Sequence, residues 1–242
     1  MPKFNRAVVL LSGGVDSATC LSLAVKECGN ENTFCLIAYY GQKHDKEIRC
    51  AKEIADYYTV PFRELDLSSV IKVEGCSLLK GSNLKIPHKS YATQLDSNDG
   101  DEAAFGIVNT YVPFRNGLLL SAAAAFAVEV GADVVVYGAH ADDAAGNAYP
   151  DCSAEFIDAM GSAIYAGTGG KVKLAAPFAF VNKAEVVRQG LQLGTPYHLT
   201  WSCYEGGEEP CGECGTCIDR AEAFKANGVE DPAIIQRKEQ LQ

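Results

Sequence analysis

The chain has 242 residues, of which 48% are hydrophobic and 21% are charged, and its formal net charge at pH 7 is -10. This length and apolar content suffice for one large domain, or one domain with an appendage, and exclude a disordered chain. The acidic balance argues against a nucleic-acid partner, because domains that bind DNA or RNA normally present a basic face. Binding of one small nucleotide stays possible, since a few cationic side chains and backbone amides suffice for one phosphate group.

The first apolar run ends at Ser12, which is too short for the core of a signal peptide, and no run approaches the roughly 20 apolar residues that cross a bilayer. We therefore expect a cytoplasmic protein with no membrane partner. Six cysteines are scattered, mostly among apolar neighbours, where a cysteine behaves as a small hydrophobe rather than as part of a disulfide framework. These are Cys20, Cys28, Cys35, Cys50, Cys76 and Cys152.

The N-terminal third alternates apolar runs with helical spacing. Residues 7–11 predict a strand, a Ser-Gly-Gly turn follows, and Ser17 to Lys26 predicts a helix. The alternation continues with a strand at 33–40, a helix at 42–58 and a strand at 61–67. Such a pattern is typical of a parallel sheet with right-handed crossovers, and we expect a doubly wound α/β fold.

Residues 68–108 interrupt this alternation with Gly, Ser, Asn, Asp and Lys, and we interpret the insertion as a lid or substrate wall rather than surface decoration. Regular elements resume with an alanine-rich helix over 118–130 that Gly131 ends. The remaining predictions are a strand at 133–137, a loop at 138–151, a helix from about Ser153, a strand at 171–177 and a helix opened by Asn182. We divide the chain into an α/β domain, 1–199, and a C-terminal metal-binding module, 200–242.

The loop Ser12-Gly13-Gly14-Val15-Asp16-Ser17 lies where the first strand becomes a helix, so its amides can close around an anion. It is neither a Walker A loop nor a dinucleotide-binding loop. SGGVDS resembles the pyrophosphate loop of the N-type ATP pyrophosphatases, which attach AMP to a substrate oxygen. The resemblance implies that Asp16 helps to position magnesium and that the Ser12 and Ser17 hydroxyls bind phosphate. The alternative is an ordinary turn with Asp16 capping the helix.

The expected ATP-binding segment comprises Leu11, Ser12, Gly13, Gly14, Val15, Asp16, Ser17, Ala18, Thr19, Cys20 and Leu21. Tyr40 and Gln42 follow the second strand at the carboxyl edge of the sheet, where an adenine pocket is plausible, although half-buried tyrosines at a helix start are an equal alternative. Lys183 begins a late helix. Periodicity alone predicts a solvated lysine there, whereas the pyrophosphatase resemblance implies contact with ATP phosphates.

Cys203, Cys211, Cys214 and Cys217 form the pattern C-x7-C-x2-C-x2-C among several glycines. Four thiolates satisfy a tetrahedral zinc ion and leave no open position, which predicts a structural metal. An iron–sulfur cluster is the main alternative, and a redox CxxC pair is a weaker one. We expect Cys217 to open a helix that runs toward Phe224.

Six segments together, SGGVDS, YYGQKH, TYVPFRN, YPDC, KAEVVRQGLQLGTPYHLTWSCY and PCGECGTC, resemble the 7-cyano-7-deazaguanine synthase family over essentially the whole chain. The resemblance implies an adenine nucleotide α-hydrolase-like fold and a homodimer with one structural zinc. It further implies that ATP, magnesium, ammonia and 7-carboxy-7-deazaguanine are the inputs, with the nitrile of queuosine-precursor biosynthesis as the product.

The expected catalytic residues are Asp16, Lys183 and Arg115, with Arg115 as the partner of an anionic oxygen. Arg115, Asn116 and Asp151 are the expected substrate-binding residues. Asp151 would accept hydrogen bonds from the guanine-like N–H groups, and its alternative role is to cap the helix that follows.

Two segments depart from the family pattern. Phe114 stands where glycine is expected, and the loop GAHADDAAGNAYPDC is longer and more acidic than the family's. We interpret His140, Asp142 and Asp143 in that loop as a solvated acidic surface, rather than as metal ligands or an acid–base pair.

Two other functions fit parts of the pattern. One is an adenylating pyrophosphatase that acts on tRNA, such as a thiolase or a lysidine synthase, which would need a basic surface that this acidic chain lacks. The other is a zinc-stapled nucleotide-binding module that couples to a protein partner or modifies a protein terminus.

Overall fold

The fold was analysed in a computed structural model that describes residues 4–96, 108–145 and 148–234. Parts of the predicted insertion (97–107), of the acidic loop (146–147) and of the C-terminal module (235–242) therefore lie outside the described residues. Five strands form one sheet in the order β3-β2-β1-β4-β5, and every pairing is parallel. The strands are β1 (Ala7–Leu10), β2 (Thr33–Tyr39), β3 (Phe62–Asp66), β4 (Val134–Val136) and β5 (Lys173–Ala175).

Each strand lies within a segment predicted from the sequence, and the doubly wound parallel sheet is confirmed. The central strands β1 and β4 are buried along their whole length, which explains their continuous apolar runs. Ala7 of β1 pairs with Thr33 of β2 on one side and with Val134 of β4 on the other. The strand order therefore runs outward from β1 in both directions, with β2 and β3 on one side and β4 and β5 on the other. Open parallel sheets form a ligand crevice at such a switch point.

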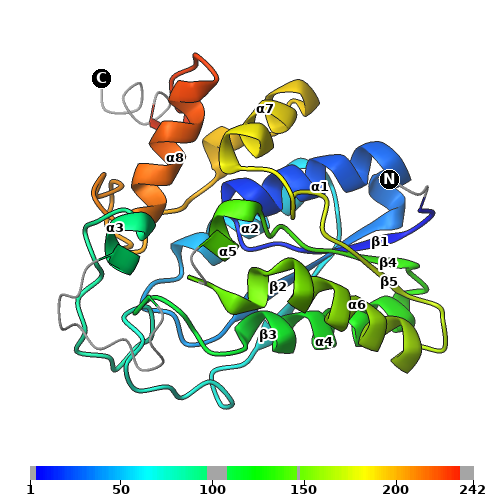
Figure 1. The fold of residues 1–242 in the computed structure, drawn as a ribbon. Helices are drawn as coiled ribbons and strands as arrows, with labels where there is room; N and C mark the ends of the chain where they lie inside the picture. The colour runs from blue at the N-terminus through cyan, green and yellow to red at the C-terminus, as the bar shows by residue number, and fades with distance from the viewer. Residues whose placement is uncertain (1–3, 97–107, 146–147, 235–242) are drawn as a thin grey trace.

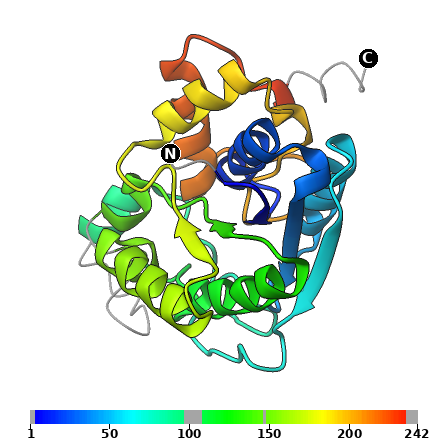
Figure 2. The same ribbon diagram turned by 90° about the vertical axis from the view of Figure 1, so that its right-hand side faces the viewer.

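Helices cover both faces of the sheet (Figures 1 and 2). One face carries α1 (Val15–Cys28), α2 (Lys46–Tyr57) and α7 (Lys183–Leu193), and the other carries α4 (Arg115–Val130) and α6 (Ala154–Gly167). Two separate hydrophobic clusters fill the layers between helices and sheet. The remaining elements are α3 (Tyr91–Asp96), α5 (Ala141–Ala144), α8 (Gly215–Ala226) and the 3-10 turns at Asn30–Asn32, Pro150–Cys152 and Tyr197–Leu199.

Two helices that border the pocket, α2 and α4, begin several residues from their predicted starts. Helix α2 starts at Lys46 rather than at 42, because Gly41 has a left-handed φ of 89° and Gln42 pairs with Leu79 of the insertion. Helix α4 starts earlier, at Arg115, with Phe114 as its left-handed N-cap (φ 55°). This backbone conformation favours glycine, which accounts for the glycine expected from the family pattern.

The Phe114 side chain points away from the sheet. It is 55% exposed and packs edge-on against Phe156 of α6, with 6.0 Å between the ring centroids. The departure from glycine at this position thus places an aromatic ring on the outer surface beside the start of α4.

Helix α8 packs on the main body through a small apolar cluster. Val15 of α1, Val187 of α7 and Phe224 of α8 belong to this cluster, together with Tyr197 and Ala223. Behind it, the Arg220 guanidinium binds the carboxylate of Asp231 at 2.6 Å, and both side chains are buried. In the described segments, no helix combines the length and hydropathy that a membrane span requires.

Candidate active site

A pocket opens at the carboxyl edge of β1, β2 and β4, on the switch point of the sheet. Ten residues predicted for the site line it: Leu11, Ser12, Gly14, Asp16, Ser17, Tyr40, Gln42, Arg115, Asn116 and Lys183. Side chains that the sequence did not assign also line it, including Glu47, Tyr91, Asp143, Trp201, Tyr204 and Asp219. The structure therefore brings the SGGVDS loop, the start of α4 and the start of α7 to one cavity.

The SGGVDS loop curls around the Ser17 hydroxyl. The Ser12 backbone N–H donates to Ser17 Oγ at 3.1 Å, and the two serine hydroxyls lie 3.0 Å apart. The N-cap of α1 is Gly14 rather than Asp16, and no side chain makes a cap hydrogen bond at this position. The first N–H groups of α1 thus face the pocket, in the arrangement that binds phosphate at a helix N-terminus.

Glycines permit the close packing around this loop. Gly13 has a φ of 88°, and a Cβ there would come within 2.2 Å of the Glu47 carbonyl oxygen. At Gly138, which follows β4, a Cβ would lie 3.2 Å from the Asp16 backbone carbon. A side chain at Gly13 would clash, and one at Gly138 would be tight, so helix α2 and the β4 loop both pack closely against the backbone of the SGGVDS loop.

Five other residues of the predicted ATP-binding segment are buried in the core. Ala18, Cys20 and Leu21 belong to the cluster between α1 and the sheet, and Val15 belongs to the cluster beneath α8. Thr19 hydrogen-bonds with the Tyr197 hydroxyl at 2.8 Å. The structure thus places these five on the core side of α1, while Ser12, Gly14, Asp16 and Ser17 face the cavity.

Asp16 and Lys183 form an ion pair inside the pocket. The Lys183 ammonium donates to Asp16 Oδ2 at 2.8 Å, and the two side chains are 13% and 21% exposed. Burial alone would raise the pKa of Asp16, but the charges of Lys183 and His140 and the Lys183 hydrogen bond outweigh it, and the pKa is lowered. Burial opposes the charge on Lys183, but Asp16 and Asp143 raise its pKa. Both groups therefore stay charged at neutral pH.

His140 is buried beside this pair, which corrects the expectation of a solvated acidic loop. Its side chain is 1% exposed, and its Nε2 lies 3.4 Å from Asp143 Oδ1 and 3.8 Å from Asp16 Oδ1. The physical reason is that α5 turns back against the start of α7, where Lys183 N donates to Asp142 Oδ2 at 2.8 Å. Periodicity could not show that this short loop folds inward.

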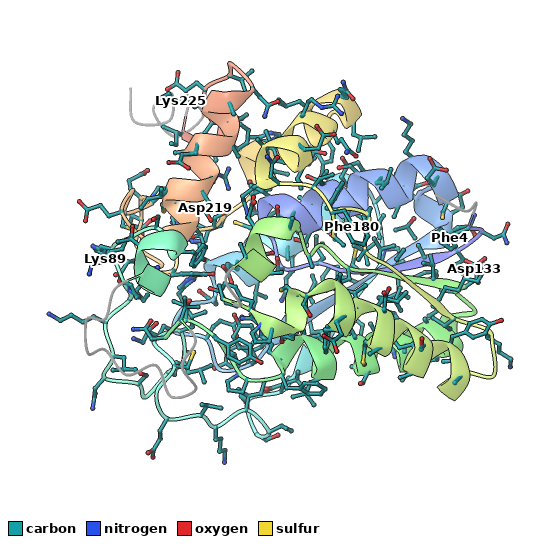
Figure 3. All side chains as sticks on the ribbon, viewed as in Figure 1. Phe4, Lys89, Asp133, Phe180, Asp219 and Lys225 are labelled. Atoms are coloured by element: carbon teal, nitrogen blue, oxygen red, sulfur yellow. The ribbon has the colours of Figure 1, made fainter. Side chains whose placement is uncertain are left out.

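Two acidic side chains near Lys183 have raised pKa values. Burial raises the pKa of Asp143, and it raises that of Asp219 to about 6, although Lys183 lowers it. Asp219 projects from the side of α8 that faces α5 and the N-terminal end of α1 (Figure 3). The side of the pocket next to the SGGVDS loop, called below the phosphate-binding side, thus combines Lys183 and His140 with three carboxylates, from Asp16, Asp143 and Asp219.

The opposite side of the pocket is aromatic. The half-buried Arg115 guanidinium donates to the Tyr40 hydroxyl at 3.1 Å and lies 5.0 Å from the centroid of the Tyr40 ring. The hydroxyl groups of Tyr91 and Tyr204 lie 3.0 Å apart and connect the insertion to the segment after Cys203. A cation beside several aromatic rings suits a flat, conjugated anion such as a heteroaromatic carboxylate.

Asp151 performs a different task in the described structure. It is 3% exposed, its Oδ2 accepts a hydrogen bond from Asn116 N at 2.9 Å, and it is not among the residues that line the pocket. The helix that follows is capped instead by Ser153, whose side chain accepts from Phe156 N. Asp151 therefore accepts a hydrogen bond from a backbone N–H at the N-terminus of α4. This contact holds Arg115 and Asn116 at the pocket.

The four C-terminal cysteines converge. The Sγ atoms of Cys203, Cys211, Cys214 and Cys217 all lie within 4.8 Å of one another. Backbone N–H groups of Cys211 and Cys214 point at Sγ atoms of the cluster at 3.3 Å, which suits thiolates. Cys214 is the N-cap of α8 and Gly215 its first residue, so the expected start at Cys217 was two residues late. Four close, preoriented sulfurs fit a tetrahedral ion with no open position.

This cluster adjoins the pocket. Trp201, the single tryptophan, packs on Cys203 and Cys214, and its backbone N–H donates to the Gly13 carbonyl at 2.9 Å. Ser202, Tyr204 and Asp219 from the same part of the chain line the cavity. The segment that carries the cysteine cluster therefore forms one wall of the pocket. Through the hydrogen bond from Trp201 to Gly13 it also holds the SGGVDS loop in place.

Comparisons with known proteins agree with this geometry. The family model described as queuosine biosynthesis protein QueC matches residues 6–228. The 7-cyano-7-deazaguanine synthase of Archaeoglobus fulgidus is 43% identical over 230 residues, which cover 95% of this chain and 90% of that protein. The synthase of Caldicellulosiruptor bescii is 43% identical over 227 residues, covering 94% and 96%.

Among solved structures, the U34-tRNA thiolase NcsA from Methanococcus maripaludis is similar with a TM-score of 0.48 and 17% identity, over 99% of this chain and 72% of that one. The sequence relatives match this chain almost end to end. The chain belongs to the QueC family of queuosine biosynthesis proteins.

Proposed function

We propose that this chain is a 7-cyano-7-deazaguanine synthase, which converts 7-carboxy-7-deazaguanine and ammonia to the 7-cyano product at the expense of ATP. Family membership supports the overall reaction. The observation that carries the ATP chemistry is the Asp16–Lys183 pair, held beside the SGGVDS loop in a pocket whose other side presents Arg115.

Two adenylations account for a nitrile. The substrate carboxylate first attacks the α-phosphorus of ATP, which releases pyrophosphate and turns a carboxylate oxygen into a good leaving group. Ammonia then displaces AMP, loses a proton and leaves the amide. The amide oxygen attacks a second ATP and releases a second pyrophosphate; loss of AMP and of both protons from nitrogen then gives the nitrile. One pyrophosphate site serves both rounds, because each round forms the same kind of oxygen–phosphorus bond.

The residues of the phosphate-binding side supply charge and orientation for these steps. The α1 N–H groups and the Ser12 and Ser17 hydroxyls face the cavity and offer donors to the departing pyrophosphate. Lys183 adds a positive charge that Asp16 and Asp143 hold in the protonated form. Preoriented donors of this kind stabilise the transferred phosphoryl charge without reorganisation at the moment of reaction.

Magnesium fits the same side of the pocket. Asp16 Oδ1 is a buried carboxylate oxygen that has no hydrogen-bond partner within the described residues, and Asp143 Oδ1 approaches the same His140 Nε2 atom that Asp16 Oδ1 does. Carboxylate oxygens are the protein ligands that magnesium prefers, together with substrate phosphates. We propose Asp16 as a ligand, with Asp143 as its nearest companion; the ion would neutralise phosphate charge during each adenylation.

The aromatic side would hold the substrate carboxylate. Arg115 has a planar fork of donors and hydrogen-bonds to the neutral Tyr40 hydroxyl, so its charge can bind an anionic oxygen. Cys152 also lines the pocket, but burial raises the pKa of its thiol well above the ordinary range. A neutral thiol is a poor nucleophile, which agrees with a mechanism that needs no covalent enzyme intermediate.

We assign a structural zinc ion to the four-cysteine cluster, because four thiolates complete a tetrahedral shell. The ion would hold the wall formed by Trp201, Tyr204 and Asp219, and would take no part in bond making. We further propose that the protein is cytoplasmic and forms a homodimer. Light scattering of the purified protein would test the dimer.

The deciding experiment is incubation of the purified protein with ATP, magnesium, ammonium and 7-carboxy-7-deazaguanine, followed by mass spectrometry of the base and phosphorus NMR of the nucleotides. The proposal predicts the cyano product, with two AMP formed per nitrile. Primary formation of ADP and orthophosphate would contradict the adenylation mechanism. Turnover only with tRNA or a protein terminus would favour the other adenylating functions.

A further inference from the structure

The carboxylates that line the pocket fall into two groups. Asp16, Asp143 and Asp219 all interact with Lys183, on the phosphate-binding side. Glu47, from the first turn of α2, is the remaining acidic residue among those that line the cavity, and its favourable charge partner is Arg115. Glu47 is thus the acidic side chain on the side of the pocket that we assign to the base.

The Glu47 side chain has no hydrogen bond or salt bridge in the described part of the chain, although it is half-buried and lines the pocket. Burial raises its pKa to about 7, while the charge of Arg115 lowers it. The Glu47 backbone is held firmly, since its carbonyl oxygen packs against Gly13. A positioned carboxylate without a donor, in a cavity built for a ligand, is a site where the ligand's own N–H groups complete the hydrogen bonding.

The proposed substrate carries such donors. A 7-deazaguanine presents an N1–H and a 2-amino group side by side on its six-membered ring, on the edge remote from the 7-carboxylate. A carboxylate with two oxygens accepts from both at once, in the same way that Glu and Asp read amino groups of bases. Asp151, the residue that the sequence suggested for this task, is occupied by the N-terminus of α4 and does not line the pocket.

Resting on the function proposed above, we infer that Glu47 binds the N1–H and 2-amino edge of the deazaguanine while Arg115 holds its carboxylate. This makes Glu47 the residue that distinguishes a guanine-type base from a base that lacks the 2-amino group. Sites built to hydrogen-bond a substrate N–H reject analogues without it, because the protein acceptor is then left buried and unpaired.

The test compares Glu47→Gln with the wild type and with Glu53→Gln, a matched change at an exposed position of the same helix. We expect E47Q to raise the KM for 7-carboxy-7-deazaguanine by roughly 100-fold and to leave the KM for ATP within about 2-fold. Calorimetric titration of the base without ATP should show the same loss of affinity. The E53Q control should match the wild type in both measurements.

The specificity readout uses the analogue that has hydrogen in place of the 2-amino group. The wild type should prefer the natural base strongly, and E47Q should lose most of that preference. Circular dichroism and a melting curve show whether E47Q is folded; Glu47→Asp, which retains the charge, serves as a second variant and should show a smaller rise in the same KM.

Three outcomes would contradict the inference, and they separate it from the proposed function. If the wild type turns over 7-carboxy-7-deazaguanine and folded E47Q retains its KM and selectivity, Glu47 does not bind the base. If only the KM for ATP rises, Glu47 binds the nucleotide instead. If the wild type neither binds nor converts the base, the proposed function itself is wrong.

Discussion

The ammonium of Lys183 lies 2.8 Å from the carboxylate of Asp16, although 167 positions separate the two residues in the chain. Asp16 stands in the first turn of α1 and Lys183 is the first residue of α7, so the packing of these two helices creates the pair. One Asp16 oxygen is used by Lys183, and the other stays without a hydrogen bond in the described structure. The pair is therefore poised to bind a cation and a phosphate together.

Replacing Asp16 by Asn should reduce AMP formation by on the order of 100-fold or more, because the uncharged amide neither binds magnesium nor balances Lys183. The protein should stay folded, and its melting temperature should fall by no more than the loss of the ion pair with Lys183 accounts for. A coupled AMP assay and a thermal melt check both statements. The exposed Asp45→Asn variant is the control. Unchanged kinetics in D16N would assign Asp16 a structural role only.

The coupling energy between Asp16 and Lys183 should be roughly 0.5–3 kcal/mol in a double-mutant cycle of Asp16→Asn and Lys183→Met. Its pH dependence follows from the shifted pKa values. Asp16 has a pKa below its ordinary 3.8, so its stabilisation is present above that pH and is lost as the pH falls through the folded-state value. Lys183 has a pKa above 10.5, so its stabilisation persists below that pH and is lost on further alkalinisation.

Urea unfolding of the four proteins between pH 3 and 11 would measure this cycle. The coupling should be flat from about pH 7 to 9, above the pKa of about 6 of the neighbouring Asp219, and should collapse at both extremes. A coupling that varies strongly near neutral pH would mean that another group titrates between the two charges.

Arg115→Lys should lose most activity, with a raised KM for the carboxylate substrate. A point charge replaces the planar fork that donates to Tyr40 and reaches the pocket. We expect a loss of at least about 10-fold in kcat/KM. The matched control is Arg63→Lys, at an exposed arginine paired with Glu129. A fully active R115K enzyme would show that the fork is unnecessary.

Cys214→Ser should lose bound zinc and thermal stability together, because three thiolates hold the ion far more weakly than four. Activity should fall as well, through loss of order in residues 182–202, which pack between the cluster and the phosphate-binding loop. Metal analysis by mass spectrometry and a melting curve provide the measurements. Cys28→Ser, at a half-buried cysteine outside the cluster, should retain both metal and stability.

Iron and sulfide in the purified protein would contradict the zinc assignment directly. A stable, zinc-free and inactive C214S protein would instead show that the cluster contributes to the chemistry.

The sheet could be predicted from the sequence because each strand is a local apolar run between turn residues. The SGGVDS loop and the four cysteines are likewise local patterns, and their residues do meet in space. Helix starts were less accurate, because a start such as Arg115 depends on the left-handed backbone of Phe114 and on the distant carboxylate of Asp151.

The remaining pocket residues could not be predicted, because their positions depend on tertiary packing. His140 and Asp143 stand in an acidic loop that looks solvated until α5 packs beside α7. Asp219 faces the cavity because α8 docks on α7, and Glu47 does so because α2 packs against Gly13. For Glu47, only its position in the sequence could have indicated a place in the pocket, since it follows the YYGQKH segment at the ligand-binding edge of the sheet.

The hydrogen bond from Trp201 to Gly13 has a consequence for the timing of synthesis. Gly13 is translated well before Trp201, the residue whose backbone holds the SGGVDS loop. At about 5–20 residues per second, roughly 10 to 40 s separate the two events. During that interval the nascent chain has the SGGVDS loop without the Trp201 contact, so the pocket cannot be complete until the segment around Trp201 has been made.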